Sequence, residues 1–136
     1  MNRLPGTITA VATHGSIALV DADVDGYRLT ATLIGADEEA AAWPAGMPVT
    51  LLFKETEVAL AKNLAGLISL RNRLPAIVTA IKRGTILTRV TLDFNGHAFE
   101  SIITTRSSHV LGLTVGDTVE ALVKANEMAV MPESDA

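Results

Sequence analysis

The chain has 136 residues, 49% of them apolar, no cysteine and a formal net charge of −4. So much apolar sequence excludes a disordered chain, and the length suits one ordinary domain or two very small ones. The sequence offers no disulfide framework, no thiolate metal site and no apolar run approaching the roughly 18 residues of a membrane span. The acidic balance argues against general nucleic-acid binding. We therefore expect a cytoplasmic protein, not bound to membranes, in which any anion site is local.

The second half of the sequence repeats the first at a spacing of 70 residues. Asn72-Arg73-Leu74-Pro75 repeats Asn2-Arg3-Leu4-Pro5, and Gly96, Gly116, Lys124 and Glu127 fall on Gly26, Gly46, Lys54 and Glu57. A spaced set of identical residues over this length indicates an internal duplication. We expect a first repeat at residues 1–68, in which 62–68 form a short linker, and a second repeat at residues 69–136.

Each copy begins with three predicted strands in succession. Alternating apolar and polar residues predict an opening strand at residues 4–11 and again at 74–81. A hairpin follows in each copy, with strands at 16–23 and 27–34 joined by Asp25-Gly26, and at 85–94 and 97–104 joined by Asn95-Gly96. These dipeptides favour the positive φ angles that a two-residue hairpin turn needs.

After each hairpin the pattern changes. Residues 37–43 and 105–111 predict one or two helical turns, and the last strands are expected near 49–53 and 57–60, then near 119–123 and 127–131. Five short strands with one short helix suit a small, partly open Greek-key barrel of the OB type. The predicted fold class is therefore all-β, with two tandem five-stranded OB-like barrels. Because barrels this small bury little core, we expect them to pack together and against other chains.

Three segments of the second copy combine hydroxyls, amides and positive charge at the ends of predicted strands, namely 69–72, 103–108 and 123–126. Thr104 or Thr105 would cap a helix start, where free N–H groups can hold a small oxyanion. Serine hydroxyls would add donors, and Arg71 or Lys124 the balancing charge. Taken singly, each feature is also compatible with an ordinary helix cap or surface charge, so the residue types alone leave both interpretations open.

These segments resemble a known family. Ser69-Leu70-Arg71-Asn72 resembles the Ser-Ala-Arg-Asn signature of the Mop domain, the molybdate-binding TOBE domain. Residues 102–107, Leu111-Gly112-Leu113 followed by Gly116, and Val123-Lys124-Ala125 are similar to it as well. The resemblance covers the whole chain as a tandem pair, like the molbindins and the carboxy-terminal half of ModE-type regulators. It implies intracellular binding of molybdate or tungstate for storage, buffering or sensing.

The resemblance also implies where the ligand is held. One wall of the site would contain the anion-binding residues Ser69, Arg71, Asn72, Lys124 and Ala125. The second wall, from a neighbouring subunit, would contain Thr104 and Ser107. It further implies self-association into a trimer or dimer with sites at the subunit interfaces. Molybdenum would be held only as its oxyanion, with no metal ligands from the protein and no organic cofactor.

The first copy departs from this pattern. Ile34-Gly35-Ala36-Asp37 stands where the second copy has Thr104 to Ser107, and Asp37 would repel an anion. Lys54 is retained, but Glu55 stands in the place of Ala125, and no Ser-x-Arg precedes Asn2. We expect the first copy to be structural, or to supply contacts to a neighbouring site.

An enzyme is not expected. His14, His97 and His109 show no metal-ligand spacing, and the sequence has no nucleophile elbow or phosphate loop. Two alternatives stay open: the ligand-sensing domain of a ModE-like regulator without its DNA-binding part, and an OB-type nucleic-acid-binding module. The second needs a basic groove with stacking aromatics, whereas only 4% of the residues are aromatic. Since nothing predicts a helix-turn-helix, we expect no nucleic-acid binding by this chain alone.

Overall fold

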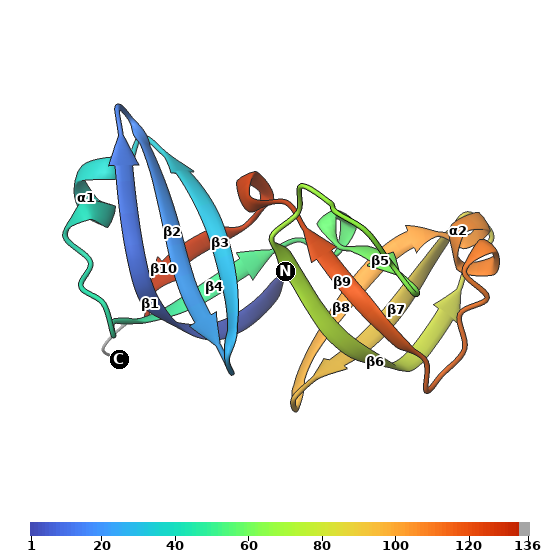
Figure 1. The fold of residues 1–136 in the computed structure, drawn as a ribbon. Helices are drawn as coiled ribbons and strands as arrows, with labels where there is room; N and C mark the ends of the chain where they lie inside the picture. Colours follow the sequence, from blue (N-terminus) through green and yellow to red (C-terminus); the bar gives the residue numbers. More distant parts are fainter. Residues whose placement is uncertain (134–136) are drawn as a thin grey trace.

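The computed structural model describes residues 1–133 as two β-barrels lying side by side (Figure 1). The first copy forms β1 (Asn2–His14), β2 (Ile17–Val24), β3 (Tyr27–Ile34), α1 (Asp37–Ala41), β4 (Pro48–Phe53), the 3₁₀ turn η1 (Glu55–Glu57) and β5 (Ala59–Ala61). The second forms β6 (Asn72–Arg83), β7 (Leu87–Phe94), β8 (His97–Thr104), α2 (Thr105–Val110), β9 (Thr118–Val123), η2 (Ala125–Glu127) and β10 (Ala129–Pro132). The predicted all-β class, with two tandem five-stranded barrels, is confirmed.

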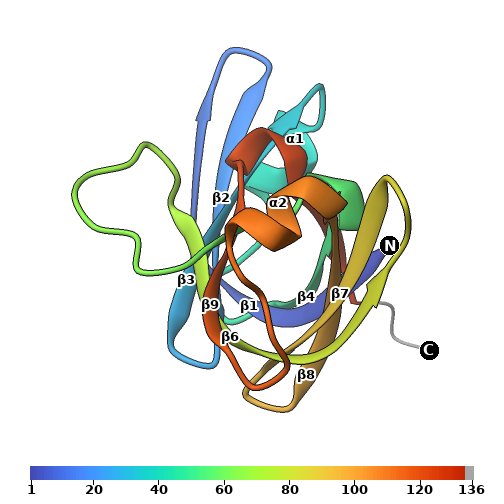
Figure 2. The same cartoon turned by 90° about the vertical axis from the view of Figure 1, so that its right-hand side faces the viewer.

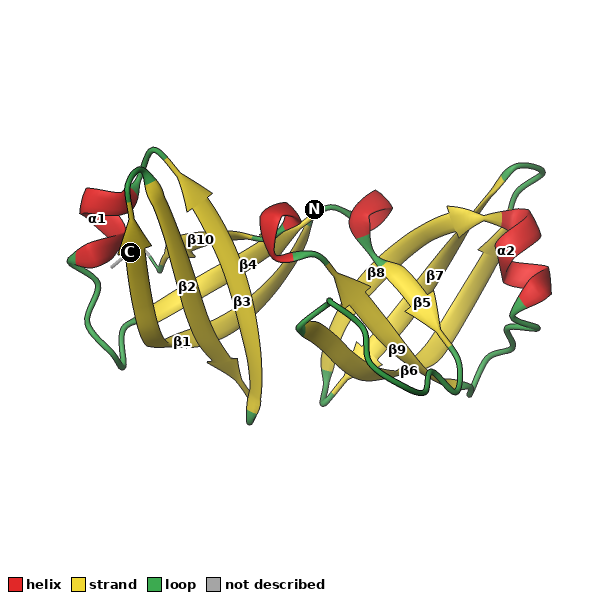
Figure 3. Ribbon diagram, turned by 45° about the horizontal axis from the view of Figure 1, so that its top comes forward, coloured by secondary structure: helices red, strands yellow, loops and turns green. Residues whose placement is uncertain are grey.

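The two copies exchange their last strands. The sheet orders are β10-β4-β1-β2-β3 and β5-β9-β6-β7-β8. β10 pairs antiparallel with β4, with Val130 opposite Leu51, and β5 pairs antiparallel with β9, with Leu60 opposite Ala121 (Figure 3). Each barrel is thus closed by a strand of the other copy, whereas the sequence had led us to expect that each copy would close its own barrel. Each barrel therefore contains strands from both sequence repeats.

The two hairpin turns have the predicted geometry. Asp25 and Gly26 have φ angles of 50° and 88°, and Asn95 and Gly96 have φ angles of 49° and 89°. Two consecutive residues with positive φ match the right-handed twist of the flanking strands, which is why Asp-Gly and Asn-Gly are favoured there. This local geometry fixes the register of β2 with β3 and of β7 with β8 in both barrels.

Each opening strand carries a bulge at the same place, just after Ile8 in β1 and just after Val78 in β6. The loop before the fourth strand holds the bulged backbone, since Gly46 N donates to Ile8 O at 2.8 Å and Gly116 N donates to Val78 O at 2.7 Å. A bulge bends its strand, so these two kinks let the long strands curve around their barrels. The helices lie at opposite ends of the molecule, with α2 across the end of the second barrel (Figure 2).

Two asparagines clamp the barrels to each other. Asn72 on β6 donates through Nδ2 to the carbonyl of Thr30 on β3 at 2.8 Å, and its Oδ1 accepts from the N–H of Thr30 at 2.7 Å. Asn2 on β1 makes the same pair of bonds with Glu100 on β8, at 2.7 and 2.9 Å. Residues 2 and 72, and residues 30 and 100, correspond at the repeat spacing. The two clamps are therefore equivalent products of the duplication.

Side-chain contacts close the junction on both sides of these clamps. The rings of Phe53 and Phe99 meet edge to face with centroids 5.8 Å apart, and those of Tyr27 and Phe94 do so at 5.3 Å. At the hairpin tips, His97 Nε2 lies 2.9 Å from Asp25 Oδ2. These aromatic pairs and hydrogen bonds fix the orientation of one barrel on the other. In residues 1–133, no helix is long and apolar enough to cross a membrane.

Candidate anion-binding site

One group of predicted ligands comes together at the junction end of the second barrel. β6 and β9 are antiparallel neighbours with Asn72 opposite Val123, so the segment before β6 meets the segment after β9. Arg71 and Ala125 consequently line the same cavity of about 460 Å³. Its other lining residues come from the first barrel and are Leu19, Asp21, Arg28 and Thr30. We call this cavity the junction pocket.

Ser69 and Lys124 lie at the same end of the barrel but outside the lining of the junction pocket. Both are exposed, and Lys124 is the residue that precedes η2, with an extended backbone (φ −66°, ψ 146°). Neither side chain has a hydrogen-bond or ion-pair partner among residues 1–133. Their hydroxyl and ammonium groups are therefore available to a ligand at the rim of the pocket.

Asn72 is placed differently from the other predicted ligands. It is only 2% exposed, and both polar ends of its amide bond to the backbone of Thr30. The donors of Asn72 are thus already used, because a buried amide that left Thr30 for a ligand would leave that backbone unsatisfied. Its position fixes Arg71, the preceding residue, against the first barrel. Asn72 therefore joins the two walls of the junction pocket rather than lining it.

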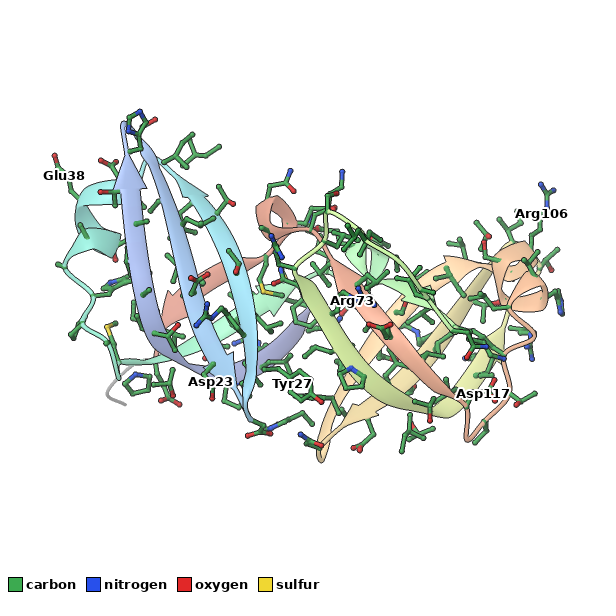
Figure 4. All side chains as sticks on the ribbon, viewed as in Figure 1. Asp23, Tyr27, Glu38, Arg73, Arg106 and Asp117 are labelled. Atoms are coloured by element: carbon green, nitrogen blue, oxygen red, sulfur yellow. The ribbon has the colours of Figure 1, made fainter. Side chains whose placement is uncertain are left out.

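The other group of predicted ligands lies at the far end of the second barrel, beside α2. Thr104 is the N-cap of α2, where its Oγ1 accepts from the N–H of Ser107 at 3.1 Å and donates to Ser107 Oγ at 2.7 Å. Thr104 lines a cavity of about 360 Å³ together with Thr85, Ile86 and Arg106. We call this cavity the helix-end pocket. Arg106 marks it in Figure 4, at the opposite end of the molecule from Glu38.

The structure therefore divides the predicted ligands into two groups instead of one. β6 leads from the junction pocket toward the helix-end pocket and is 12 residues long. A strand of that length has a contour of roughly 36 Å. Within one chain, the hydroxyls of Thr104 and Ser107 cannot reach an anion held at Arg71. Each chain thus carries the predicted ligands as two separate groups, the candidate half-sites, at opposite ends of the second barrel.

An ion pair joins β6 to β9 near the junction pocket. Arg73, on β6 next to the pocket, binds Glu120 through two hydrogen bonds of 2.7 and 2.8 Å, and this bonding lowers the pKa of the Glu120 carboxyl (Figure 4). Glu120 is thereby kept ionised and paired with Arg73, and it does not line the junction pocket. Among residues 1–133, no group of three or more histidines and carboxylates could hold a metal ion.

Another carboxylate ties the linker to the loop that follows α2. Asp117 accepts from the N–H of Thr114 at 2.9 Å and from Lys62 Nζ at 3.1 Å, and these bonds lower its pKa, the Thr114 bond having the largest effect (Figure 4). Lys62 also donates to the carbonyl of Leu111 at 2.9 Å. The linker that follows the exchanged strand β5 is thus anchored to the loop after α2. This anchor holds the exchanged strand in the second barrel.

Sequence reasoning missed the contribution of the first barrel. Asp21, Arg28 and Thr30 belong to the hairpin of the copy that lacks the family motif, and nothing in their sequence context separates them from other surface residues. Their relevance arises from the packing of β3 against β6, which the Asn72 clamp fixes. The internal repeat did contain one useful signal, because Asn2 keeps the clamp residue in a copy that lacks the ligand pattern.

The fold defines the class as tandem OB-like barrels, with the predicted anion-binding residues in the second copy. The TOBE domain model matches residues 1–60 and again residues 68–130. The chain therefore belongs to the TOBE domain family, which confirms the resemblance found in the sequence.

The comparison with solved structures finds two proteins that are described as molybdate-binding. The structure resembles that of ModG, described as a cytoplasmic molybdate-binding protein and solved with molybdate bound, with a TM-score of 0.89 and 27% identity over 97% of this chain and 96% of that one. A molybdate-binding protein from Sporomusa ovata shares 42% identity over 44% of this chain and 90% of its own, with a TM-score of 0.43.

The molybdenum import ATP-binding proteins ModC of Brucella abortus (strain 2308) and Brucella suis biovar 1 (strain 1330) are each 45% identical to this chain over 80 residues. The match covers 58% of this chain and 22% of each relative. The chain thus spans about a fifth of the length of these curated relatives.

Proposed function

We propose that the protein binds molybdate, or tungstate, as an intact oxyanion. The observation that carries the proposal is its likeness to ModG, whose structure holds molybdate, over 97% of the chain at 27% identity. The second copy supports it, because Arg71 and Ala125 of the family motif line one cavity at the barrel junction. The proposed role is reversible binding without chemical conversion of the ligand, in the cytoplasm, as described for ModG.

The chemistry of the half-sites suits a tetrahedral dianion. Arg71 and Lys124 would supply positive charge, and Ser69 a hydroxyl donor, at the junction pocket. The small side chain of Ala125 leaves room for the ligand to approach the backbone. Beside the helix-end pocket, Ser107 Oγ accepts a hydrogen bond from the hydroxyl of Thr104, so its own hydroxyl proton is free to point toward a ligand. Charge-assisted hydrogen bonds of this kind are the strong ones in anion recognition.

A complete site requires two chains in this proposal. The helix-end pocket of one copy would cover the junction pocket of another, bringing Thr104 and Ser107 to Arg71 and Lys124. Two large apolar side chains are exposed at this end of the barrel: Ile86, which lines the helix-end pocket, is 76% exposed, and Val110, the last residue of α2, is 82% exposed. Covering such side chains would stabilise an assembly. We propose a trimer or dimer with its sites at the interfaces.

A second candidate role is a molybdate-sensing unit within a larger protein or assembly. It is favoured by the ModC relatives, in which the matched segment is about a fifth of the chain. The binding step is the same in storage and in sensing. The nucleic-acid alternative is less well supported, because Phe53, Phe94 and Phe99 are buried and cannot stack on bases.

Titration calorimetry tests the proposal with molybdate, tungstate and sulfate, on protein whose oligomer mass is measured in parallel. We expect molybdate and tungstate to bind with micromolar or tighter affinity, and sulfate more weakly because it is smaller than the cage. Bound ligand should also raise the thermal unfolding temperature by mass action. Assembled protein that gives no heat with molybdate or tungstate would contradict the proposal.

A further inference from the structure

The first barrel contributes its own charged residues to the junction pocket. Asp21 on β2 is paired with Thr30 on β3, and Arg28 is two residues before Thr30, so all three side chains face the same side of the sheet. All three line the pocket together with Arg71 of the second barrel. The anion pocket is therefore made from both copies of a single chain, before any neighbouring subunit is considered.

Two arginines of this pocket lack a partner. In the part of the chain from residue 1 to 133, neither Arg28 nor Arg71 has a hydrogen-bond or ion-pair partner, whereas Arg89 binds Glu100 at 3.0 Å. Both arginines are exposed and line the same cavity from opposite barrels. Like charges that share a cavity repel each other, and an anion between them would turn that repulsion into two favourable interactions.

The single carboxylate of the pocket is partly satisfied. Asp21 Oδ1 accepts a hydrogen bond of 2.7 Å from the hydroxyl of Thr30. The backbone of Thr30 is in turn held by Asn72, next to Arg71. These bonds fix the position of Asp21 relative to Arg71. A carboxylate held in this position cannot donate a hydrogen bond to an oxyanion and repels it.

We propose that Arg28 is a second cationic ligand of the oxyanion and that Asp21 lowers the affinity of the same site, keeping the binding reversible. Arg28 and Arg71 would then hold the anion from two barrels, with Asp21 offsetting part of their charge. The first copy thereby contributes to binding although it lacks the family motif. This assignment rests on the proposed function, so its test must include wild-type binding.

The test compares Arg28→Gln with Arg3→Gln by calorimetry with molybdate. Arg3 is a matched control because it is an exposed arginine of the first copy that lines the cavity equivalent to the junction pocket. We expect Arg28→Gln to weaken binding about tenfold, the effect of losing one hydrogen bond to a charged group, and Arg3→Gln to leave it within about twofold. Arg28→Lys, which keeps the charge, should recover part of the affinity.

A second pair of variants tests Asp21. Asp21→Asn keeps an acceptor for the Thr30 hydroxyl and removes the charge, so it should tighten molybdate binding roughly threefold, as expected for one partly screened charge. Asp23→Asn, which makes the same change of net charge two residues away and outside the pocket lining, should have less effect. Equal effects of the two variants would overturn the role of Asp21.

The outcomes separate the two proposals. Wild-type protein that binds neither molybdate nor tungstate would contradict the proposed function. Wild-type binding that is unchanged in Arg28→Gln would overturn the role of Arg28 and leave the proposed function standing. Thermal unfolding of each variant shows whether it is folded. An equal loss of affinity in Arg28→Gln and Arg3→Gln would overturn the role of Arg28, because the loss would then follow from net charge alone.

Discussion

The junction pocket has an equivalent in the other half of the molecule, and the two differ in charge rather than in architecture. The equivalent cavity, of about 410 Å³, lies at the start of β1 and includes Glu55, Thr91, Ala98 and Glu100. At the repeat spacing these residues correspond to Ala125, Asp21, Arg28 and Thr30 of the junction pocket. Two carboxylates thus replace an alanine and a threonine, an alanine replaces an arginine, and a threonine replaces the aspartate Asp21.

This difference shows what the duplication kept in each half. Both halves keep the asparagine clamp, the bulge and the hairpin turn, all of which serve the fold. Only the junction pocket keeps arginines from both barrels and no glutamate. In the equivalent cavity, Glu55 and Glu100 pair with the amino terminus and with Arg89, so these two cations are not free to bind an anion. The two cavities of this protein therefore share the same backbone scaffold but differ in their charged side chains.

The largest effect is expected from breaking the clamps. Asn72→Ala should lower the free energy of unfolding by about 3 kcal/mol, because it leaves the buried N–H and C=O of Thr30 without partners. Asn2→Ala should cost less, about 2 kcal/mol, because its bonds to Glu100 are only partly buried and water can replace them. Chemical denaturation of both variants measures the difference. Equal losses would contradict the difference in burial between the clamps.

The clamps also differ in what they support. Asn72→Ala should weaken molybdate binding, because Asn72 holds the two walls of the junction pocket together. Asn2→Ala should leave the affinity unchanged in protein that is still folded. Calorimetry below the unfolding transition makes this comparison. An affinity loss in Asn2→Ala would show that the two cavities are coupled.

The next effect comes from converting one pocket into the other. Ala125→Glu installs the residue of the equivalent cavity, and its carboxylate should weaken molybdate binding roughly 30-fold, as expected for a like charge placed beside the ligand. The reverse change, Glu55→Ala, should alter the affinity by less than about twofold, within the error of independent distant sites. Molybdate titration of both variants checks this. Unaltered affinity in Ala125→Glu would show that the ligand is held elsewhere.

A smaller effect is expected from the two lysines that follow β9 and β4. Lys124 and Lys54 occupy equivalent positions, each just before a 3₁₀ turn. Lys124→Ala should weaken binding about tenfold by removing one charge-assisted contact, whereas Lys54→Ala should have little effect. Side-by-side calorimetry of the two variants decides the matter. Equal losses would contradict the assignment of the binding site to the second copy.

Most of the fold followed from local sequence patterns. The hairpins were predictable because Asp25-Gly26 and Asn95-Gly96 determine their turns from a few adjacent residues. The strand exchange was not, because β5 and β10 have only 3 and 4 residues and follow equivalent 3₁₀ turns. The local sequence of each strand is compatible with pairing to either β4 or β9. The choice is made by contacts between distant segments, such as the bond of 2.7 Å from Ser101 Oγ to the carbonyl of Val58.

The site was predictable to the extent that a motif marked it. Arg71 and Ala125 were predicted as ligands from the sequence, and the structure places both in the lining of one cavity. Asn72 belongs to the same motif, yet only the structure shows that its amide is used by Thr30. Arg28 could not be found, because its place beside Arg71 depends on how the barrels pack. Residue types can thus indicate an anion site, whereas the partners of each donor depend on tertiary structure.

The smallest effect concerns an ion pair for which the first barrel has no equivalent. Glu120 corresponds to Thr50, so only the second barrel has the pair of Arg73 with Glu120. Hydrogen bonding from Arg73 lowers the pKa of Glu120 from its ordinary value of 4.5. Because the folded-state pKa is lowered, this pair stabilises the fold fully above pH 4.5, and its contribution is lost as the pH falls through the lowered value. The Glu120→Gln variant should therefore be slightly less stable than wild type at pH 7, and the difference should disappear in strong acid.

Denaturant unfolding of wild type and Glu120→Gln at a series of pH values measures this difference. Thr50→Gln places the same side chain at the corresponding position of β4, where no such pair exists, so any change it causes should be the same at every pH. The pair is partly exposed, since each side chain keeps 30% of its accessible surface, and solvent screening keeps the effect small. A difference between wild type and Glu120→Gln that persists unchanged into strong acid would mean that the glutamine disturbs packing on β9, and that the ion pair adds nothing to the stability of the barrel that carries the anion motif.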